Sequence, residues 1–555
     1  MEQMAANACH RELVGVPAEQ SNVGESNQKN NGSTMHRRDI FKAIPLLMTP
    51  SLARADVLPL RFIPNANLTS LDPIWTTALV AQVHGYLVYD TLYGIDASNN
   101  LQPQMCAGHD VSAEELTWTF TLRDGLTFHD GEKVLAKDCV MSLKRWASRD
   151  SFGQQLSRVA NEIAALDDRR FQIRLKRPFR QMLYGLGARS CFMMPERAAM
   201  TPASEQTKET IGSGPFRFLP GEWVSGARAG YARFNGYVPR QEPPSFYAGG
   251  KVAHFERVEW IVQPDPATAA AALQKGEVDW IEQPLIDLCP MLRTAADVVV
   301  AVNDPFGWQP IIALNHLNPP FNNPKLRQAL LPALDQKAFV TAVIGEQAEL
   351  GHVPGGFFAD GQPMASHVGL EVLTRPRNLP LARRLVAQSG YRGEPVVLLS
   401  PSDRPVYSQI SFVARDLFEK LGLTVDFQAM DWGTVVTRRT SQNPIDKGGW
   451  SAFITALDGV TVSNPGGNFA LRGSGKKAWF GWPTDEKLEE LRDAWFDAPD
   501  LASQKALAEQ IQLRGLETLP YIPLGQIFQP TAFRSDIKDI VKSMFPLFWG
   551  VRRQA

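Results

Sequence analysis

Three predicted strands in the C-terminal half of the 555-residue chain are each followed by residues suited to binding a charged ligand. They cover residues 395–399, 423–429 and 450–457. Arg404 follows the first strand, Asp431 and Trp432 the second, and Asp458 the third. Because ligands bind at the carboxyl ends of strands in open parallel sheets, we expect these side chains to converge on one crevice. A guanidinium, an indole and a carboxylate gathered there could hold a zwitterion.

Each of these side chains also has an ordinary structural interpretation. Asp458 precedes Gly459, and this pair is typical of a turn. Arg404 follows Asp403 and can form a surface pair, while Trp432 can pack in the core. The sequence leaves both interpretations open for each residue.

No catalytic or cofactor motif accompanies these residues. The HExxH, CxxC and GxSxG patterns are absent, as is an acidic calcium loop. The segment 473–476 (GSGK) lacks the first glycine and the final Ser or Thr of a phosphate loop. Residues 212–214 lack the third glycine of a dinucleotide fingerprint. We therefore predict no catalytic residue, no cofactor and no resident metal ion.

The spacing of apolar residues predicts the secondary structure around these side chains. Apolar residues from Ile410 to Leu421 recur at helical intervals, and Gly422 is suited to end that helix. A strand, this helix and a second strand form a unit that closes right-handed onto a parallel sheet. Earlier in the chain, 116–145 (LTWTFTLRDGLTFHDGEKVLAKDCVMSLKR) combines an alternating strand, glycine turns and a short amphipathic helix.

This last stretch resembles the signature of the family 5 extracytoplasmic solute-binding proteins, the peptide- and nickel-type receptors of ATP-binding-cassette importers. Their block reads DGLTWTFxLRxGVxFHDGxPxTAxDVxxSxxR. Three further segments are similar to segments of that family: 211–218 (IGSGPFRF), 272–279 (ALQKGEVD) and 318–334 (NPPFNNPKLRQALLPAL). The resemblance implies an α/β, two-lobed periplasmic binding protein fold with discontinuous lobes and an inserted subdomain.

The resemblance also implies ligand contacts. Arg404 falls on the arginine that some peptide receptors use for the ligand carboxylate, and Trp432 falls on their pocket tryptophan. Asp458 falls near the aspartate that takes the peptide α-amino group. This chain departs from those receptors at 455–457 (TAL), where they have Trp-Thr-Gly, and at 463–466 (SNPG), where they have Gly-Asp-Pro-Asp. The departures imply a pocket of different shape.

Two further groups enter through the resemblance. Trp75, Thr76 and Thr77 align with a loop that contacts ligand in the family, although Thr76 or Thr77 could instead cap a helix. A nickel-type receptor could bind a metal chelate through one histidine. The candidates for that role are His84, His316 and His352.

The predicted organisation follows the family pattern. We expect lobe I at 56–98, 209–307 and 520–555, an inserted subdomain at 99–208, and lobe II at 308–519. The chain would cross between lobes near Pro305–Pro310 and again near Pro520–Pro523, because proline-flanked extended segments suit hinges.

The N-terminal residues predict export. His36–Lys42 (HRRDIFK) is close to the twin-arginine consensus, an apolar run follows at 43–52, and Ala53–Ala55 is a small-x-small cleavage site. We expect a signal peptide at 35–55. Residues 1–34 are polar and without periodicity, so we expect a disordered or misannotated extension, with translation starting at Met35.

Composition excludes other partners. The net charge is −1, with 44% hydrophobic and 21% charged residues, which argues against nucleic acid or a polybasic membrane contact. Beyond the leader, no run of 18 apolar residues occurs. Four cysteines follow the leader at widely spaced positions: Cys106, Cys139, Cys191 and Cys289. Buried free thiols are the favoured interpretation, and a disulfide stays open.

The expected function is therefore that of a monomeric periplasmic binding component of an ATP-binding-cassette importer. It would capture a peptide or similar small zwitterion by lobe closure and deliver it to a membrane permease. A ligand-sensing module that uses the same cleft is the alternative. A periplasmic hydrolase is a weaker alternative, because the sequence offers no nucleophile or metal.

Overall fold

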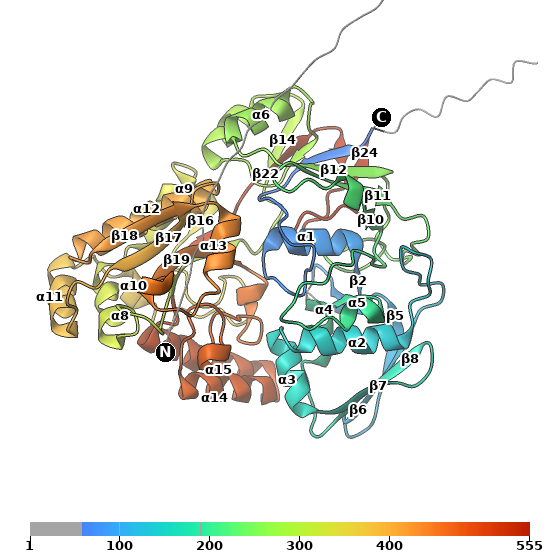
Figure 1. Cartoon of the computed structure of the whole chain (residues 1–555), viewed down its shortest axis with the longest axis horizontal. Helices are drawn as coiled ribbons and strands as arrows, with labels where there is room; N and C mark the ends of the chain where they lie inside the picture. Colours follow the sequence, from blue (N-terminus) through green and yellow to red (C-terminus); the bar gives the residue numbers. More distant parts are fainter. Residues whose placement is uncertain (1–57, 99, 189–190, 555) are drawn as a thin grey trace, which may run out of the picture. The chain divides into compact units, whose positions relative to one another are not determined.

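A computed structural model describes residues 58–554, apart from 99, 189 and 190. The predicted extension at 1–34 and the predicted signal peptide at 35–55 lie outside these residues. Two seven-stranded sheets dominate the described chain (Figure 1). The architecture is mixed α/β, as the sequence predicted.

The first sheet gathers strands from distant parts of the chain. Its order is β10 (Phe216–Phe218), β11 (Arg228–Arg233), β12 (Arg257–Ile261), β1 (Leu60–Ile63), β13 (Trp280–Ile281), β22 (Thr531–Arg534) and β14 (Val298–Ala301). Strand β1 runs parallel to both β12 and β13, so their carboxyl ends share one edge. Helices α6 (Pro266–Gln274) and α7 (Cys289–Arg293) belong to the same region.

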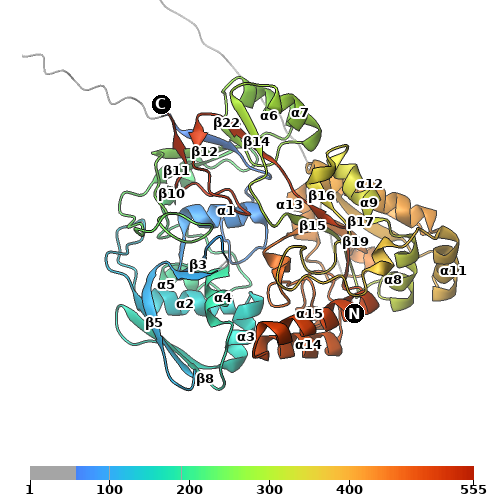
Figure 2. The same ribbon diagram turned by 180° about the vertical axis from the view of Figure 1, so that it is seen from behind.

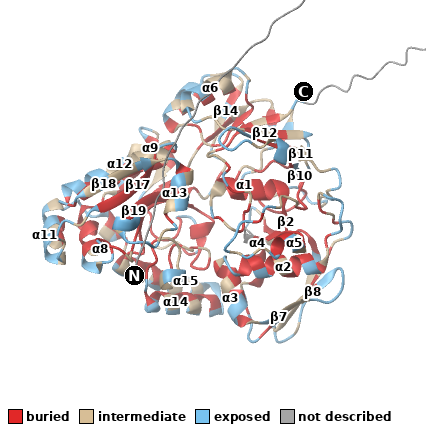
Figure 3. Cartoon of the chain, in the orientation of Figure 1, coloured by how far each residue is buried: buried red, intermediate tan, exposed pale blue. Residues whose placement is uncertain are grey.

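Helix α1 (Leu79–Val88) follows β1 and is buried along almost its whole length (Figure 3). Most of its residues are apolar and all but Leu79 are buried, which is typical of a helix enclosed by the core. His84 of this helix contacts the rings of Phe218 and Tyr231, on β10 and β11. The first sheet and α1 thus share one core.

The second sheet contains the predicted strand–helix–strand unit. Its order is β16 (Gly351–His352), β21 (Gln526–Ile527), β15 (Trp308–Leu314), β19 (Ala452–Asp458), β17 (Val396–Pro401) and β18 (Val425–Met430), with β20 (Tyr521–Pro523) also paired to β15. Strand β17 is parallel to β18 and β19, and α12 (Pro405–Lys420) joins β17 to β18. All six residues of β17 are buried, as its continuous apolar run predicted. The predicted unit is confirmed.

A four-stranded antiparallel sheet contains the signature strand. Its order is β5 (Cys106–Val111), β6 (Thr117–Leu122), β8 (Arg170–Leu175) and β7 (Ala160–Ala165). Phe120 and Leu122 of β6 are buried, whereas the threonines that alternate with them are only partly covered. The accompanying helices are α2 (Ala136–Ala147), α3 (Ser151–Val159), α4 (Met182–Ala188) and α5 (Glu196–Ala199). Three two-stranded sheets complete the strands: β2 (Asp90–Thr91) with β9 (Phe192–Met193), β3 (Tyr93–Ile95) with β4 (Leu101–Pro103), and β23 (Ile537–Lys538) with β24 (Arg552–Arg553).

Helices α14 (Glu486–Asp497) and α15 (Leu501–Thr518) lie beside α3 when the molecule is seen from behind (Figure 2). Phe152 of α3 meets Phe496 of α14 edge to face, with ring centroids 5.4 Å apart, and Gln155 donates to Asp493. The α-helices that follow β15 are α8 (Pro324–Leu330), α9 (Gln336–Ile344), α10 (Glu371–Thr374), α11 (Leu379–Ser389), α12, α13 (Trp432–Arg438), α14 (Glu486–Asp497) and α15 (Leu501–Thr518).

The chain passes between the two seven-stranded sheets twice. It leaves β14 for β15 through residues 302–307, and it returns from β21 to β22 through 528–530. The first passage lies where the prolines predicted a hinge. Strands β20 and β21 both pair with β15 of the second sheet. The chain therefore returns to the first sheet after β21, whereas the predicted lobe boundary is at residue 520. The boundaries of the lobes and the inserted subdomain stay a prediction.

The four cysteines that follow the leader all lie within the described residues. Cys106, Cys139, Cys191 and Cys289 are all buried free thiols, the state that the sequence favoured. Among the residues that the structure describes, no helix has the length and apolar character needed to cross a bilayer.

Glycines at 212 and 214 allow the segment before β10 to press against the end of α1. A Cβ at Gly212 would lie 2.0 Å from the Val88 carbonyl oxygen, and one at Gly214 would lie 2.7 Å from the Leu87 oxygen. The Gly214 N–H donates to the Val88 oxygen at 2.9 Å. The backbone of this turn lies so close to the end of α1 that both positions require glycine.

We expect Gly212→Ala to lower the free energy of unfolding by about 1–3 kcal/mol, because the new methyl group overpacks a backbone contact. Gly221→Ala is the matched control, since a Cβ there meets nothing within 4 Å. Urea unfolding of both variants gives the comparison. Equal stability of the two variants would contradict this account of the glycine turn.

Candidate functional site

Three adjoining cavities lie where strands of both seven-stranded sheets end. The outer cavity, about 140 Å³, is bordered by residues just past the carboxyl ends of β1, β12, β13 and β17. The middle cavity, about 20 Å³, shares Arg404 and Gln283 with it. The inner cavity, about 40 Å³, shares Gln283, Trp308 and Gln529 with the middle one. We refer to the three together as the cleft.

Arg404 lies between the outer and middle cavities, as the position after β17 predicted. Its backbone is the N-cap of α12, and its side chain is 8% exposed. One guanidinium nitrogen donates to Asn65 Oδ1 at 3.1 Å, and the other is 3.5 Å from Gln283 Oε1. The guanidinium also stacks 4.9 Å from the Tyr407 ring centroid. Arg404 therefore connects the second sheet to the first.

Asn65 continues this contact to a buried carboxylate. Its backbone N–H and side-chain amide donate to the two carboxylate oxygens of Glu282, at 2.6 and 2.5 Å. Burial raises the pKa of Glu282 to about 7, while the Asn65 N–H groups and the charge of Arg404 oppose that rise. We call this chain of contacts the Arg404–Asn65–Glu282 relay.

Trp432 lies behind Arg404 and lines none of the three cavities. Its ring is 5.2 Å from that of Tyr407, and the Arg404 guanidinium carbon is 5.9 Å from its centroid. The preceding Asp431 accepts from Thr434 N at 3.0 Å as the N-cap of α13. The structure brings Trp432 and Arg404 together, and the tryptophan supports the arginine from the side away from the cleft.

Asp458 ends β19 beside the inner cavity. The residue is 4% exposed, and its carboxylate accepts from Thr461 N at 2.7 Å and from the Thr461 hydroxyl at 2.6 Å. Its backbone is in register with Trp308 of β15, which lines the middle and inner cavities. Asp458 acts electrostatically on Asp304, a lining residue of the inner cavity. Asp458 thus lies close to the inner cavity but is not one of its lining residues.

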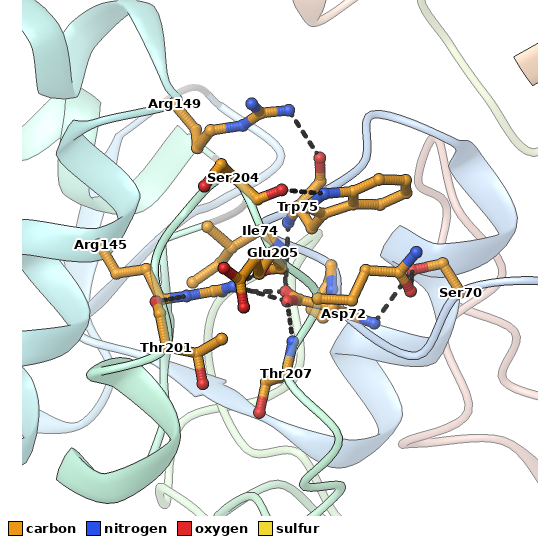
Figure 4. Close-up of polar contacts among 12 residues, drawn as sticks. Ser70, Asp72, Ile74, Trp75, Arg145, Arg149, Thr201, Ser204, Glu205 and Thr207 are labelled. Carbon is orange, nitrogen blue, oxygen red and sulfur yellow. Dashed lines mark hydrogen bonds and ion pairs between the residues drawn. The ribbon is translucent and has the colours of Figure 1, made fainter. Parts of the chain in front are cut away.

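A separate polar network holds the loop of Trp75, Thr76 and Thr77 (Figure 4). Arg145 donates two hydrogen bonds to Asp72, at 3.0 and 2.7 Å, and this ion pair is fully buried. Asp72 also accepts from the backbone N–H groups that follow it, including that of Trp75. The Trp75 indole donates to the Ser204 carbonyl at 3.2 Å.

The two threonines of this loop have different environments. Thr76 is buried and its hydroxyl accepts from Ala78 N, whereas Thr77 is exposed. The N-cap of α1 is Ala78, so neither threonine is the cap residue. The loop lines none of the three cavities, and its ligand role stays a prediction.

The three histidines considered for a metal chelate lie outside the cleft. Burial lowers the pKa of His84 and of His316 to about 3, so both are neutral. They are hydrogen-bonded to the Tyr231 hydroxyl and the Leu519 carbonyl. Among the described residues, no group of three or more His, Cys, Asp or Glu side chains is placed to hold a metal ion.

Sequence analysis missed three cleft residues. Asn65 and Glu282 each follow a parallel strand of the first sheet, so the rule that selected Arg404 would have found them there. Asp304 lies in a passage between the sheets and has no such signal.

Comparison with known proteins places this geometry in a family. The model described as "Bacterial extracellular solute-binding proteins, family 5 Middle" matches residues 100–479. A Sinorhizobium fredii (strain NGR234) protein named "Probable peptide ABC transporter periplasmic-binding protein y4tO" is 36% identical over 530 residues, which cover 94% of this chain and 100% of that protein. The chain belongs to family 5 of the bacterial extracellular solute-binding proteins. The predicted family is confirmed.

Solved structures share the fold of this family 5 protein. A dipeptide binding protein from pseudoalteromonas sp. SM9913, in complex with Met-Leu, has a TM-score of 0.76 at 18% identity, covering 90% of this chain and 100% of that one. The binding protein AgaA from "A.tumefacien R10", in complex with agropinic acid, has a TM-score of 0.75 at 20% identity, covering 90% and 99%. These likenesses confirm the two-domain periplasmic binding protein fold.

We expect Arg145→Met to lower the free energy of unfolding of the family 5 protein by about 3–5 kcal/mol, because it leaves Asp72 buried without its counterion. Lys137→Met on the same helix removes an exposed ion pair with Glu196 and should leave stability nearly unchanged. Urea unfolding tests both. A small loss in Arg145→Met would mean that the buried pair does not hold the loop.

We expect the stability that Asp304 and Glu282 contribute to the unliganded protein to be lost as pH rises from 5 to 8, while the neutral, buried His84 and His316 act in the opposite direction below about pH 6.5. Burial raises the pKa of Asp304 and of Glu282 to about 7, so the native state binds these protons more tightly than the unfolded chain. Their contribution is fully present below about pH 4 and is lost as pH passes about 7. The melting temperature of the wild type relative to that of Asp304→Asn should therefore fall as pH rises across this range, because the variant lacks this titration. A difference that does not change with pH would contradict the assignment.

Proposed function

We propose that this protein is the extracytoplasmic binding component of an ATP-binding-cassette importer, and that it captures a peptide or similar small zwitterionic solute. The observation that carries the proposal is a cleft with Arg404 on one side and carboxylates on the other. The name of the Sinorhizobium fredii relative, which includes "peptide ABC transporter", supports the same class of ligand and a membrane permease as partner.

The relay gives the proposed carboxylate contact a physical basis. Amide oxygens of Asn65 and Gln283 now occupy acceptor positions on the Arg404 guanidinium. A ligand carboxylate could replace both with a bidentate, charge-assisted pair. Little water reaches this guanidinium, so the pair would be stronger than at the surface.

Capture would favour the closed arrangement of the two sheets. Arg404 comes from the second sheet, and its partners Asn65 and Gln283 come from positions that follow strands of the first. A ligand that contacts both sides stabilises closure only through contacts that the open form lacks. The proposal assigns binding and no chemical step, so the ligand should leave unchanged.

The proposal includes the compartment. The family is extracytoplasmic, and the twin-arginine leader at 35–55 would export the protein to the periplasm. Trp432, Asp458 and the loop of Trp75, Thr76 and Thr77 are proposed ligand contacts or supports of such contacts.

We expect Arg404→Ala to weaken binding of a zwitterionic peptide by about 30-fold or more, because losing one partner of a buried charge pair costs about 2–5 kcal/mol. Arg415→Ala on the exposed side of α12 is the matched control. Native mass spectrometry of the exported protein would identify the bound solute, and calorimetry would give the affinities. Asp458→Asn tests the ammonium contact in the same way.

Retention of full affinity in Arg404→Ala would place the ligand elsewhere. If no zwitterionic solute binds to the wild-type protein, the proposed function fails. A solute recovered in altered chemical form would favour a hydrolase instead.

A further inference from the structure

The inner cavity has an acidic lining. Its charged lining residues are Glu282 and Asp304, and no lysine, arginine or histidine borders it. The C-terminal segment 540–546 forms another wall; its one charged residue, Lys542, is exposed and is not among the lining residues. At about 40 Å³, the cavity has room for one small polar group. We call this cavity the acidic subsite.

One oxygen of Asp304 lacks a partner in the protein. Asp304 Oδ1 accepts from Phe306 N at 2.9 Å, as in a tight turn. Its other oxygen, Oδ2, is buried without a hydrogen-bond partner among the described residues, although the residue is only 5% exposed. A buried carboxylate oxygen without a donor is costly and is rare in native structures. The Gly307 N–H also acts on this carboxyl and lowers its pKa, and the orphan oxygen leaves an acceptor position open to a donor on a ligand.

The charged residues around Asp304 in the subsite are carboxylates. Asp458, at the end of β19, raises the pKa of Asp304, and Glu282 lies across the subsite. The passage from β21 contributes the uncharged side chains of Gln529 and Thr531. Arg404, whose charge acts on Glu282, lies outside the lining, so the charged residues that border the subsite are carboxylates alone.

We propose that the acidic subsite binds a cationic group of the ligand, a primary ammonium or a guanidinium, with Asp304 Oδ2 as its acceptor. This inference rests on the proposed function. It adds that the ligand carries a positive charge and that this charge binds beside Asp304, a residue that the sequence did not identify. The subsite adjoins the middle cavity through Trp308 and Gln529, so a ligand with its carboxylate on Arg404 can extend past Trp308 to reach Asp304. Trp280 and Trp308 also line the subsite.

The cation could be the α-amino group of a peptide or a lysine side chain, and matched probes distinguish them. The probes are Lys-Ala-Ala, Ala-Lys-Ala and Ala-Ala-Lys, their norleucine analogues, and their N-acetylated forms. We expect at least a tenfold loss of affinity, measured by calorimetry, when the group that enters the subsite loses its charge. A loss with norleucine identifies the side chain, and a loss with acetylation identifies the α-amino group.

Asp304→Asn tests the acceptor with little change of shape. Asparagine keeps an oxygen for Phe306 N and replaces Oδ2 by a donor. The preference for the charged probe should then fall to within about twofold. Glu282→Gln should weaken the preference less, since both of its oxygens already bind Asn65. Asp446→Asn, at an exposed position, is the control and should retain the preference.

The number of protons released on binding distinguishes a ligand contact of Asp304 from a purely structural role, because a structural role would not change that number. At pH 6 the carboxyl of Asp304 is mostly protonated in the free protein, because its pKa is about 7. A bound cation favours the carboxylate, so binding should release protons, measured in two buffers of different ionisation enthalpy. The release should disappear in Asp304→Asn. Binding of charged probes without proton release, or with the preference intact in Asp304→Asn, would overturn the inference.

A peptide-independent probe separates this inference from the proposed function. Ethylammonium chloride should raise the melting temperature of the wild type more than sodium chloride of equal ionic strength, and should not do so in Asp304→Asn. If ethylammonium stabilises the protein while no peptide binds, the subsite stands and the peptide proposal fails. If peptides bind with no charge preference and ethylammonium has no effect, the subsite alone is refuted.

Discussion

The Arg404–Asn65–Glu282 relay is the contact on which the geometry of the cleft depends. An arginine buried to this degree must find acceptors, and Arg404 finds them on residues that follow strands of the other sheet. Asn65 can present its oxygen to Arg404 because its amide nitrogen is held by Glu282. Loss of any member would leave a buried polar group without its partner, so the three positions constrain one another.

The need of buried polar groups for partners also explains polar residues that lie outside the cleft. Asp72 and Arg145 satisfy each other in the interior and fix the loop of Trp75, while Lys251 and Asp90 form a second fully buried pair. Such pairs add little net stability compared with apolar packing, yet they are costly to break. Their role here is to define one arrangement of long loops that have little regular structure of their own.

Much of the fold could be predicted because the apolar residues of its strands and helices recur at regular intervals. The run at 395–399, the helical spacing from Ile410 to Leu421 and the alternation at 423–429 fixed the parallel unit, and with it the position of Arg404. Side-chain partners were not predictable in this way. The contact of Thr461 with the Asp458 carboxylate is local, since the two residues are three positions apart, and an Asp followed by Thr at this spacing can indicate it. The sequence does not indicate that Trp432 lies beside Arg404, because that contact follows from packing between separate elements. The sequence did not indicate Asp304, because residues in a passage between sheets show no regular spacing of apolar side chains.

The two passages between the sheets, 302–307 and 528–530, are short and supply Asp304 and Gln529 to the inner cavity. If the sheets rotate about an axis through these passages, residues near the axis travel least, whereas Arg404 and Asn65, on opposite walls, separate most. The inner end of the cleft would then keep nearly the same shape whether the walls are apart or together. A solute could dock first at this stationary end, and the approach of Arg404 would be the slower, affinity-determining event that follows.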